Sequence, residues 1–150
     1  MLEAHKAENT SPLKSKFMAN YTQSGSLNDR SYNLNATMQP IGPSFTVRKL
    51  RIRSSLELEL AGTVSAQALS ASNGILFEIR VNGTLPNFKI QGSLKAGDLN
   101  DSIVMKSVYT SLPIGTYTVQ VYAQAAPGGT ATGVILDPGG WGERILATEI

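Results

Sequence analysis

The stretch Arg51–Leu60, RIRSSLELEL, decides the fold class, because apolar and charged side chains alternate along it. From Phe45 to Leu60 the even positions include five aliphatic residues and the odd positions five charged ones, namely Leu50, Ile52, Leu56, Leu58 and Leu60 against Lys49, Arg51, Arg53, Glu57 and Glu59. A period of two places each set on its own face of a β-strand. We expect the aliphatic face to fill a core and the charged face to meet a subunit neighbour or solvent, with a bend at Ser54-Ser55.

The same period recurs along the rest of the chain. Ile75 to Val81 alternates and is followed by Asn82-Gly83, a dipeptide that favours a two-residue hairpin turn. Further strands are predicted near residues 103–109, 117–123, 132–136 and 144–150. Roughly eight strands, spaced about 8 to 12 residues apart, are typical of a sandwich or jelly roll. We therefore predict an all-β jelly-roll or β-sandwich domain of antiparallel strands over residues 44–150.

Residues 1–43 are polar and show no sustained period, which predicts an extended N-terminal arm that could add one or two short strands. Pro40, Gly42 and Pro43 mark its end, so the folded domain should begin close to Ser44. Residues 1–53 hold eight Lys/Arg against three Asp/Glu, and residues 54–150 hold five against eight, so the two parts carry about +5 and −3. Either a head-to-tail attraction between copies or an acidic partner for the front part is consistent with this asymmetry.

The side chains of common catalytic sites are scarce. The chain has no cysteine, and its single histidine, His5, lies in the arm, which excludes thiolate chemistry, a Ser-His-Asp triad and multi-histidine metal sites. Glu57 and Glu59 could flank a glycosidic bond, but ion pairs with Lys49, Arg51 and Arg53 are the favoured interpretation. Asp98 and Asp101 match no full calcium loop. We expect no enzymatic activity and no cofactor.

Few other ligands are indicated. Trp141, between glycines, could stack on a carbohydrate, but an anchor in a turn or subunit contact is favoured. The basic run from Arg48 to Arg53 has no interleaved aromatic residues, so nucleic-acid binding is not expected. The N-terminus has no signal-peptide pattern, and no apolar window approaches the roughly 20 residues that span a bilayer, so no membrane is expected either.

The run from Leu112 to Ile150 resembles the closing hairpins of the trimeric, tumour-necrosis-factor-like jelly-roll domains of tailed-phage virions. The resemblance rests on LPIGTY at Leu112–Tyr117, a long alternating strand, a glycine-rich loop and the final strand Ile145–Ile150; the hairpin Ile75–Gly83 resembles the same domains. It implies a homotrimer whose sheet faces meet around a threefold axis. It also implies one of two functions, cementing a capsid or recognising a host surface.

If Met1 is the natural start, the front of the chain holds no heptads or Gly-x-y repeat that could form a fibre shaft. This favours a capsid decoration protein on the virion surface, assembled in the host cytoplasm, whose arm binds the major capsid protein and neighbouring subunits. The predicted interface residues are Arg51, Arg53, Glu57, Glu59, Tyr117 and Trp141, and the predicted arm residues are Lys14, Lys16, Phe17, Tyr21 and Arg30. The alternative is the receptor-binding head of a tail fibre or adhesin, with Trp141 and the tyrosines binding host surface glycans.

Overall fold

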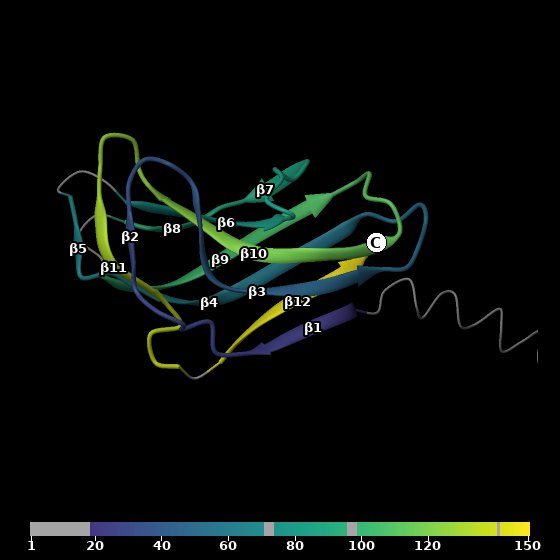
Figure 1. Ribbon diagram of the computed structural model, residues 1–150, viewed down its shortest axis with the longest axis horizontal. Helices are drawn as coiled ribbons and strands as arrows, with labels where there is room; N and C mark the ends of the chain where they lie inside the picture. Colours follow the sequence, from purple (N-terminus) through teal and green to yellow (C-terminus); the bar gives the residue numbers. More distant parts are fainter. Residues whose placement is uncertain (1–18, 71–73, 96–98, 141) are drawn as a thin grey trace, which may run out of the picture.

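The computed structural model describes residues 19–70, 74–95, 99–140 and 142–150, which form strands and turns without a helix. Two antiparallel sheets pack face to face as a β-sandwich (Figure 1), which confirms the predicted all-β class. The twelve strands in this part of the chain are β1 (Ala19–Gly25), β2 (Tyr32–Leu34), β3 (Gln39–Lys49), β4 (Leu56–Ser65), β5 (Ala68–Leu69), β6 (Ile75–Val81), β7 (Phe88–Ile90), β8 (Gly92–Leu94), β9 (Asn100–Tyr109), β10 (Gly115–Ala125), β11 (Ala131–Leu136) and β12 (Glu143–Glu149).

The small sheet has the order β3-β10-β6-β8. In the large sheet β1, β12, β4, β9 and β7 lie side by side, while β11, β2 and β5 continue it beyond the C-terminal part of β4. The chain passes from β3 in the small sheet to β4 in the large one, and from β9 back to β10. This alternation between facing sheets is the connectivity of a jelly roll.

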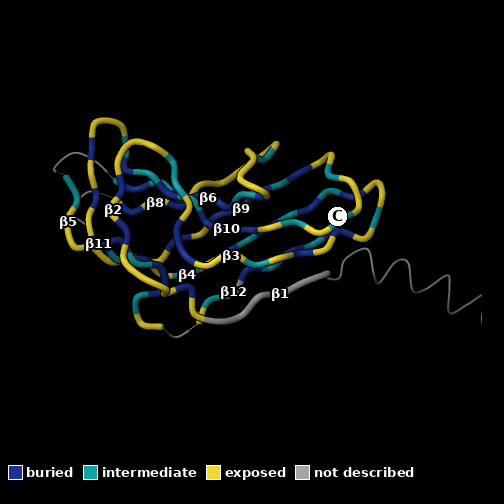
Figure 2. Tube along the Cα trace, viewed as in Figure 1, coloured by how far each residue is buried: buried dark blue, intermediate teal, exposed yellow. Residues whose placement is uncertain are grey.

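The core lies between the two sheets and follows the predicted alternation. Leu56, Leu58 and Leu60 of β4 are fully buried and belong to the same cluster as Phe77 and Ile79 of β6. Figure 2 shows buried residues along the strands of both sheets. Each such side chain removed from water contributes about 1.5 to 3 kcal/mol before conformational entropy is subtracted. A chain without cysteine gains its stability from this packing.

Two polar side chains of β9 join the sheets inside the core. Ser107 donates a hydrogen bond to the carbonyl oxygen of Ile79, with Oγ and O 2.7 Å apart. The hydroxyl of Tyr109 donates to the Thr84 carbonyl at 2.6 Å and accepts from the Val81 amide at 2.8 Å. Because each of these buried hydroxyls has a partner, they add directional contacts at little desolvation cost.

The predicted Asn82-Gly83 turn is confirmed. Both residues have positive φ angles, 49° and 71°, and the amide of Thr84 donates to the carbonyl of Val81 at 2.9 Å. A two-residue hairpin turn needs this left-handed backbone, which asparagine and glycine adopt at least cost. After the single bridge between Val81 and Thr84 the chain leaves the small sheet, and its next strand, β7, pairs with β9 in the large one.

The prediction that all five even-numbered aliphatic residues fill the core was wrong for Leu50 and Ile52, which are exposed. Strand β3 ends at Lys49 and β4 begins at Leu56, so the intervening residues form a turn between the sheets. In β3 the odd-numbered residues from Val47 onward face the core, whereas in β4 the even-numbered residues from Leu56 to Leu60 do so. As a result the odd-numbered Lys49 faces inward and is buried, although the pattern placed it on the outer face.

The sandwich also takes in residues that the sequence analysis assigned to the arm. β1, β2 and the first half of β3 precede Ser44, and Leu27, Leu34 and Ile41 are buried in the core. Pro40 and Pro43 lie within β3, which is possible because β3 is the edge strand of its sheet and proline lacks a ladder donor. Gly42, with φ of 71°, sits where the register between β3 and β10 shifts.

Candidate functional surfaces

One end of the sandwich brings together two turns that cross between the sheets. Lys49 pairs with Gly115 at the start of β10, and Leu56 pairs with both Tyr109 and Glu149. The β3–β4 turn (residues 50–55), the β9–β10 turn (residues 110–114) and Ile150 therefore share this end, as Figure 1 shows. Ser55 and Ile150 also exchange backbone hydrogen bonds of 2.8 and 2.9 Å.

The buried carboxylate of Glu149 fixes the β3–β4 turn. It accepts hydrogen bonds from the amides of Leu50 and Arg51, the latter at 3.0 Å, and from Arg51 Nε at 3.3 Å. Ser54 Oγ lies 3.1 Å from the same carboxylate. Arg51 Nη2 in turn donates to the Glu149 carbonyl at 3.2 Å. A single glutamate thus satisfies two backbone donors and a guanidinium at once.

Lys49 fixes the turn from the other side. Its buried ammonium donates to the Arg51 carbonyl, which also lies 3.2 Å from Ser54 Oγ. Tyr117 acts similarly on the neighbouring turn, because its hydroxyl donates to the Pro113 carbonyl at 2.6 Å. Both turns are held in place by side chains of the strands that they connect.

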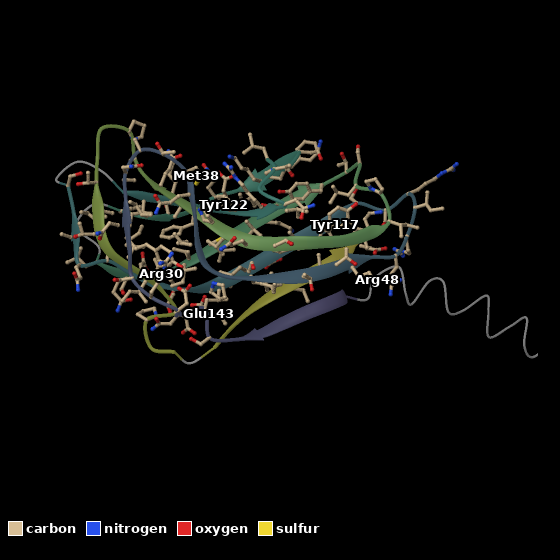
Figure 3. The ribbon with its side chains drawn as sticks, in the orientation of Figure 1. Arg30, Met38, Arg48, Tyr117, Tyr122 and Glu143 are labelled. Carbon is tan, nitrogen blue, oxygen red and sulfur yellow. The ribbon has the colours of Figure 1, made fainter. Side chains whose placement is uncertain are left out.

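The outer surface of this end is apolar and basic. Leu50, Ile52, Ile114 and Ile150 are between 49% and 78% exposed. Arg48 and Arg53 are exposed, and neither has an ion-pair partner among the described residues. Figure 3 shows Arg48 and Tyr117 toward this end. We call the surface formed by Arg48, Leu50, Arg51, Ile52, Arg53, Ile114 and Ile150 the basic tip.

A second surface is the outer face of the large sheet. Glu57 of β4 forms an ion pair with Lys106 of β9, with Oε1 and Nζ 2.6 Å apart. Hydrogen bonding to the Glu57 carboxylate raises the pKa of the Lys106 ammonium. Glu59 lies directly opposite Lys106 in the register. Within the described part of the chain the predicted pairing of these glutamates with Lys49, Arg51 and Arg53 does not form, because those three residues belong to β3 and the turn after it; ion pairs of this kind between subunits stay a prediction.

A groove of about 230 Å³ runs along this face beside the ion pair. It is lined by Glu57, Phe88, Lys89, Ile90, Lys106 and Val108. Phe88 and Ile90 of the short edge strand β7, and Val104 of β9, are more than half exposed, with Phe88 at 66%. We call Phe88, Ile90, Val104 and Val108, together with Glu57 and Lys106, the sheet-face patch.

A third surface, the outer face of the small sheet, carries a cluster of polar side chains. The buried carboxylate of Glu78 binds Arg80 at 3.2 Å, Lys89 at 3.1 Å and the Gln91 amide at 3.1 Å. Burial raises the pKa of Glu78, but the hydrogen bonds and charges of Lys89 and Arg80 outweigh it, so the net pKa is lowered. Arg80 also stacks on Tyr122, with 4.9 Å between its guanidinium carbon and the ring centroid.

The carboxylate of Glu143, at the start of β12, has hydrogen-bond partners on only one of its two oxygens among the described residues. Its Oε1 accepts from the Thr63 amide at 2.5 Å and lies 3.2 Å from the Thr63 hydroxyl, while its Oε2 is buried without a partner among the described residues. Burial raises the pKa of Glu143, and the charge of Asp137 adds to this increase beyond what the Thr63 hydrogen bonds offset. Figure 3 shows Glu143 away from Arg48 and the basic tip.

The predicted interface residues do not form one site. Arg51, Arg53 and Tyr117 lie at the basic tip end, whereas Glu57 and Glu59 lie on the outer face of the large sheet. Trp141 lies outside the described residues. The sequence interpretation missed Glu149 and Phe88, which are far in sequence from their neighbours. No local pattern links Glu149 to a turn 98 residues earlier.

The predicted arm residues have three different outcomes. Lys14, Lys16 and Phe17 lie outside the described residues. Tyr21 belongs to β1, of whose side chains nothing is described. Arg30 is part of the folded sandwich and not of an arm: it is exposed between β1 and β2, and its guanidinium lies 4.7 Å from the ring centroid of Tyr32.

The described part of the chain offers neither a cluster of metal-binding side chains nor a membrane-spanning helix. No group of three or more His, Cys, Asp or Glu side chains there could hold a metal ion. Asp98 falls outside this part, and Asp101 is exposed at the start of β9, where its Oδ1 accepts from the Ser102 amide at 2.8 Å. Within the same residues, no helix has the length and apolar character to cross a membrane.

No family model matches the chain, and no curated protein matches it. Among solved structures it is similar to the tripod of the bacteriophage Tuc2009 baseplate, with a TM-score of 0.42 and 13% identity over 87% of this chain and 64% of that one. Dimeric latent PorU from Porphyromonas gingivalis matches with a TM-score of 0.47 and 12% identity over 87% of this chain and 13% of that one. CBM35 from Cellvibrio japonicus Abf62 matches with a TM-score of 0.36 and 14% identity over 87% and 88% of the two chains. This chain therefore spans less than two thirds of the first two, and nothing about function follows from likenesses at this level.

Proposed function

We propose that the protein is a non-enzymatic structural component of a tailed-phage virion, a homotrimeric decoration protein that binds the outside of the capsid. The observation that supports this proposal best is the distribution of exposed apolar side chains. Of the nine large hydrophobic residues exposed in the described part of the chain, four lie at the basic tip and three on the sheet-face patch. A component of an assembly needs two such surfaces, one for its own copies and one for the larger particle.

The sheet-face patch suits contact between copies. Its apolar residues surround an ion pair, and the patch contributes both a carboxylate and an ammonium group. A surface that carries both signs of charge can face a copy of itself without net repulsion. In a trimer the contact would be head-to-tail, with one side of the patch meeting the opposite side of the patch on the next copy, and three such contacts around a threefold axis would close the ring.

The basic tip and the N-terminal segment suit contact with the capsid. The chain enters β1 at Ala19, which pairs with Thr148, so residues 1–18 join the sandwich at the end where the basic tip lies. That segment contains the predicted arm residues Lys14, Lys16 and Phe17. Both elements would then reach the same neighbouring surface, the major capsid protein.

The trimer is tested by sedimentation equilibrium of the purified chain. We expect the mass of three chains, and conversion to monomer when Phe88→Glu places a carboxylate on the sheet-face patch. Leu85→Glu is the matched control, because Leu85 is similarly exposed but lies outside the patch. A wild-type monomer at all concentrations would contradict the proposal.

Capsid binding is tested with shells assembled from the major capsid protein that is encoded together with this chain. Cosedimentation and electron microscopy of shells with and without the chain should show added density on the outer surface. Removal of residues 1–18 should weaken binding to the shells. The shortened chain should still have the mass of a trimer in solution. Shells that never retain the full chain would refute the decoration role.

A second candidate function is glycan recognition by a receptor-binding head. The observation in its favour is the partly exposed Tyr122 on the outer face of the small sheet, next to Arg80 and between Gln120 and Gln124 on β10. Aromatic rings flanked by amide and charged groups can stack on sugars and bind their hydroxyls. A glycan array probed with wild type and with Tyr122→Ala tests it. Binding that Tyr122→Ala abolishes would favour this function over decoration.

A further inference from the structure

We infer that the basic tip docks onto an acidic protein surface that contains an apolar pocket, and that Ile52 is the side chain that enters this pocket. The inference rests on the proposed function and deepens it, because it assigns the capsid-facing site and the chemistry of the partner. It concerns a surface built by residues of the folded sandwich, separate from the N-terminal segment.

The charge of the tip selects an acidic partner. Residues 48–55 contribute four cationic side chains, Arg48, Lys49, Arg51 and Arg53, and the Glu149 side chain places one carboxylate against them, so these five side chains together carry 4 − 1 = +3. Lys49 and Arg51 are engaged in the turn, which leaves Arg48 and Arg53 directed to solvent. Arginine is enriched at protein interfaces because its planar group binds carboxylates in pairs of hydrogen bonds.

The exposed aliphatic side chains of the tip indicate that the partner surface has an apolar pocket in addition to its acidic groups. Ile52 is 78% exposed, and Leu50, Ile114 and Ile150 surround the same end. Isolated exposed hydrophobic residues are ordinary, but four at one end of a small domain mark an interaction surface. Central apolar anchors within a charged rim are the usual arrangement of binding energy at protein interfaces.

The turn is already rigid before binding. The Glu149 carboxylate, the Lys49 ammonium and the Ser54 hydroxyl hold the backbone of residues 50–54. A loop that is fixed in advance loses little conformational freedom on binding, so more of the contact energy appears as affinity.

An acidic protein fits these observations better than a membrane or a nucleic acid. Membrane-interface surfaces favour exposed Trp and Tyr, whereas at this end Tyr109 is buried and Tyr117 is partly buried with its hydroxyl bound to Pro113. Nucleic-acid surfaces stack bases on aromatic rings, whereas the tip presents isoleucine and leucine. Aliphatic anchors between arginines suit a pocket rimmed by Asp and Glu.

The first experiment tests the chemistry without the capsid. Amide spectra of the ¹⁵N-labelled full chain are recorded with a random glutamate–tyrosine copolymer, with polyglutamate, with phosphatidylcholine–phosphatidylserine vesicles and with oligothymidylate. The copolymer combines carboxylates with apolar rings. We expect it to shift the amide resonances of residues 48–53 and 114 at a lower concentration than polyglutamate does. Tighter binding to vesicles or to the oligonucleotide, or shifts centred elsewhere, would overturn the inference.

The second experiment uses variants with matched controls. Ile52→Glu and Arg53→Glu should each weaken shell binding and copolymer binding at least about tenfold, the effect expected of a central interface residue. Leu85→Glu and Lys95→Glu make the same substitutions at exposed positions outside the tip and should change neither. Equal losses in tip and control variants would refute the assignment. If wild type binds the copolymer through the tip but never binds shells, the proposed function fails while the tip assignment stands.

Discussion

The carboxylate of Glu149 lies 3.0 Å from the amide nitrogen of Arg51 and 3.3 Å from its Nε, although 98 residues separate the two in sequence. This contact joins β12, the last strand of the large sheet, to the turn between β3 and β4.

Replacing Glu149 with Gln should destabilise the fold by about 1 to 3 kcal/mol, because a neutral amide cannot accept from two amides and balance the Arg51 charge at once. The free energy of unfolding in urea, monitored by Trp141 fluorescence or circular dichroism, measures the change. Glu59→Gln, on the outer face of the same sheet, should stay within about 0.5 kcal/mol of wild type. Equal effects of the two substitutions would mean that the turn does not depend on Glu149.

Replacing Glu143 with Gln should stabilise the protein at pH 7. Its pKa is raised by burial, so the folded state favours the protonated carboxyl; the contribution to stability is full below the ordinary glutamate pKa and is lost as pH rises through the raised folded pKa. The variant should therefore have a higher Tm than wild type at pH 7, and the difference should vanish near pH 4. A variant less stable than wild type at pH 7 would contradict this account.

Glu78→Gln should have the opposite pH dependence. Burial raises the pKa of Glu78, but the hydrogen bonds and charges of Lys89 and Arg80 lower it by more, so the net pKa is below the ordinary glutamate value. The ionised form therefore stabilises the fold above the ordinary glutamate pKa, and this contribution is lost as pH falls through the lowered pKa of the folded state. The variant should unfold more easily than wild type at pH 7, and the gap should narrow in acid. Thermal unfolding of both proteins between pH 3 and pH 8 gives the comparison, and a gap that widens in acid would count against it.

Gly74→Ala should cost more stability than Gly62→Ala. A Cβ at residue 74 would meet the Leu94 carbonyl oxygen at 2.4 Å, which is backbone within a paired strand. At residue 62 it would meet the end of the Glu143 side chain at 2.2 Å, and that side chain can rotate away at the cost of its hydrogen bonds to Thr63. Urea denaturation of the two variants should rank them in this order. The reverse order would show that the Glu143 contact is the more rigid of the two.

The alternation of apolar residues was sufficient to predict the all-β class, because a period of two places every second side chain on the face of the strand that packs against the other sheet. Leu56, Leu58 and Leu60 lie in the core as predicted, and the Asn82-Gly83 turn forms as its backbone preferences require. The same pattern wrongly predicted that Leu50 and Ile52 would be buried. A period of two cannot reveal where a chain passes from one sheet to the other, since the pattern on each side looks the same.

The candidate surfaces were harder to predict, since they depend on contacts between distant strands. Arg51 and Arg53 were identified as surface residues, but the partner of Arg51 is Glu149, on a strand that the sequence alone could not align with it. Likewise, Glu57 was expected to pair with a basic residue of its own run and instead pairs with Lys106. Phe88 and Ile90 belong to a three-residue strand, too short for a periodic signal.

The two prolines of β3 limit the ways in which copies of this domain can join. An uncovered strand edge invites further strands, and a chain that accepted them there could grow into a fibre without end. Pro40 and Pro43 remove two amide donors from that edge, so growth in this direction is discouraged. At this edge, association is left to side-chain contacts, which favour closed complexes with a definite number of members.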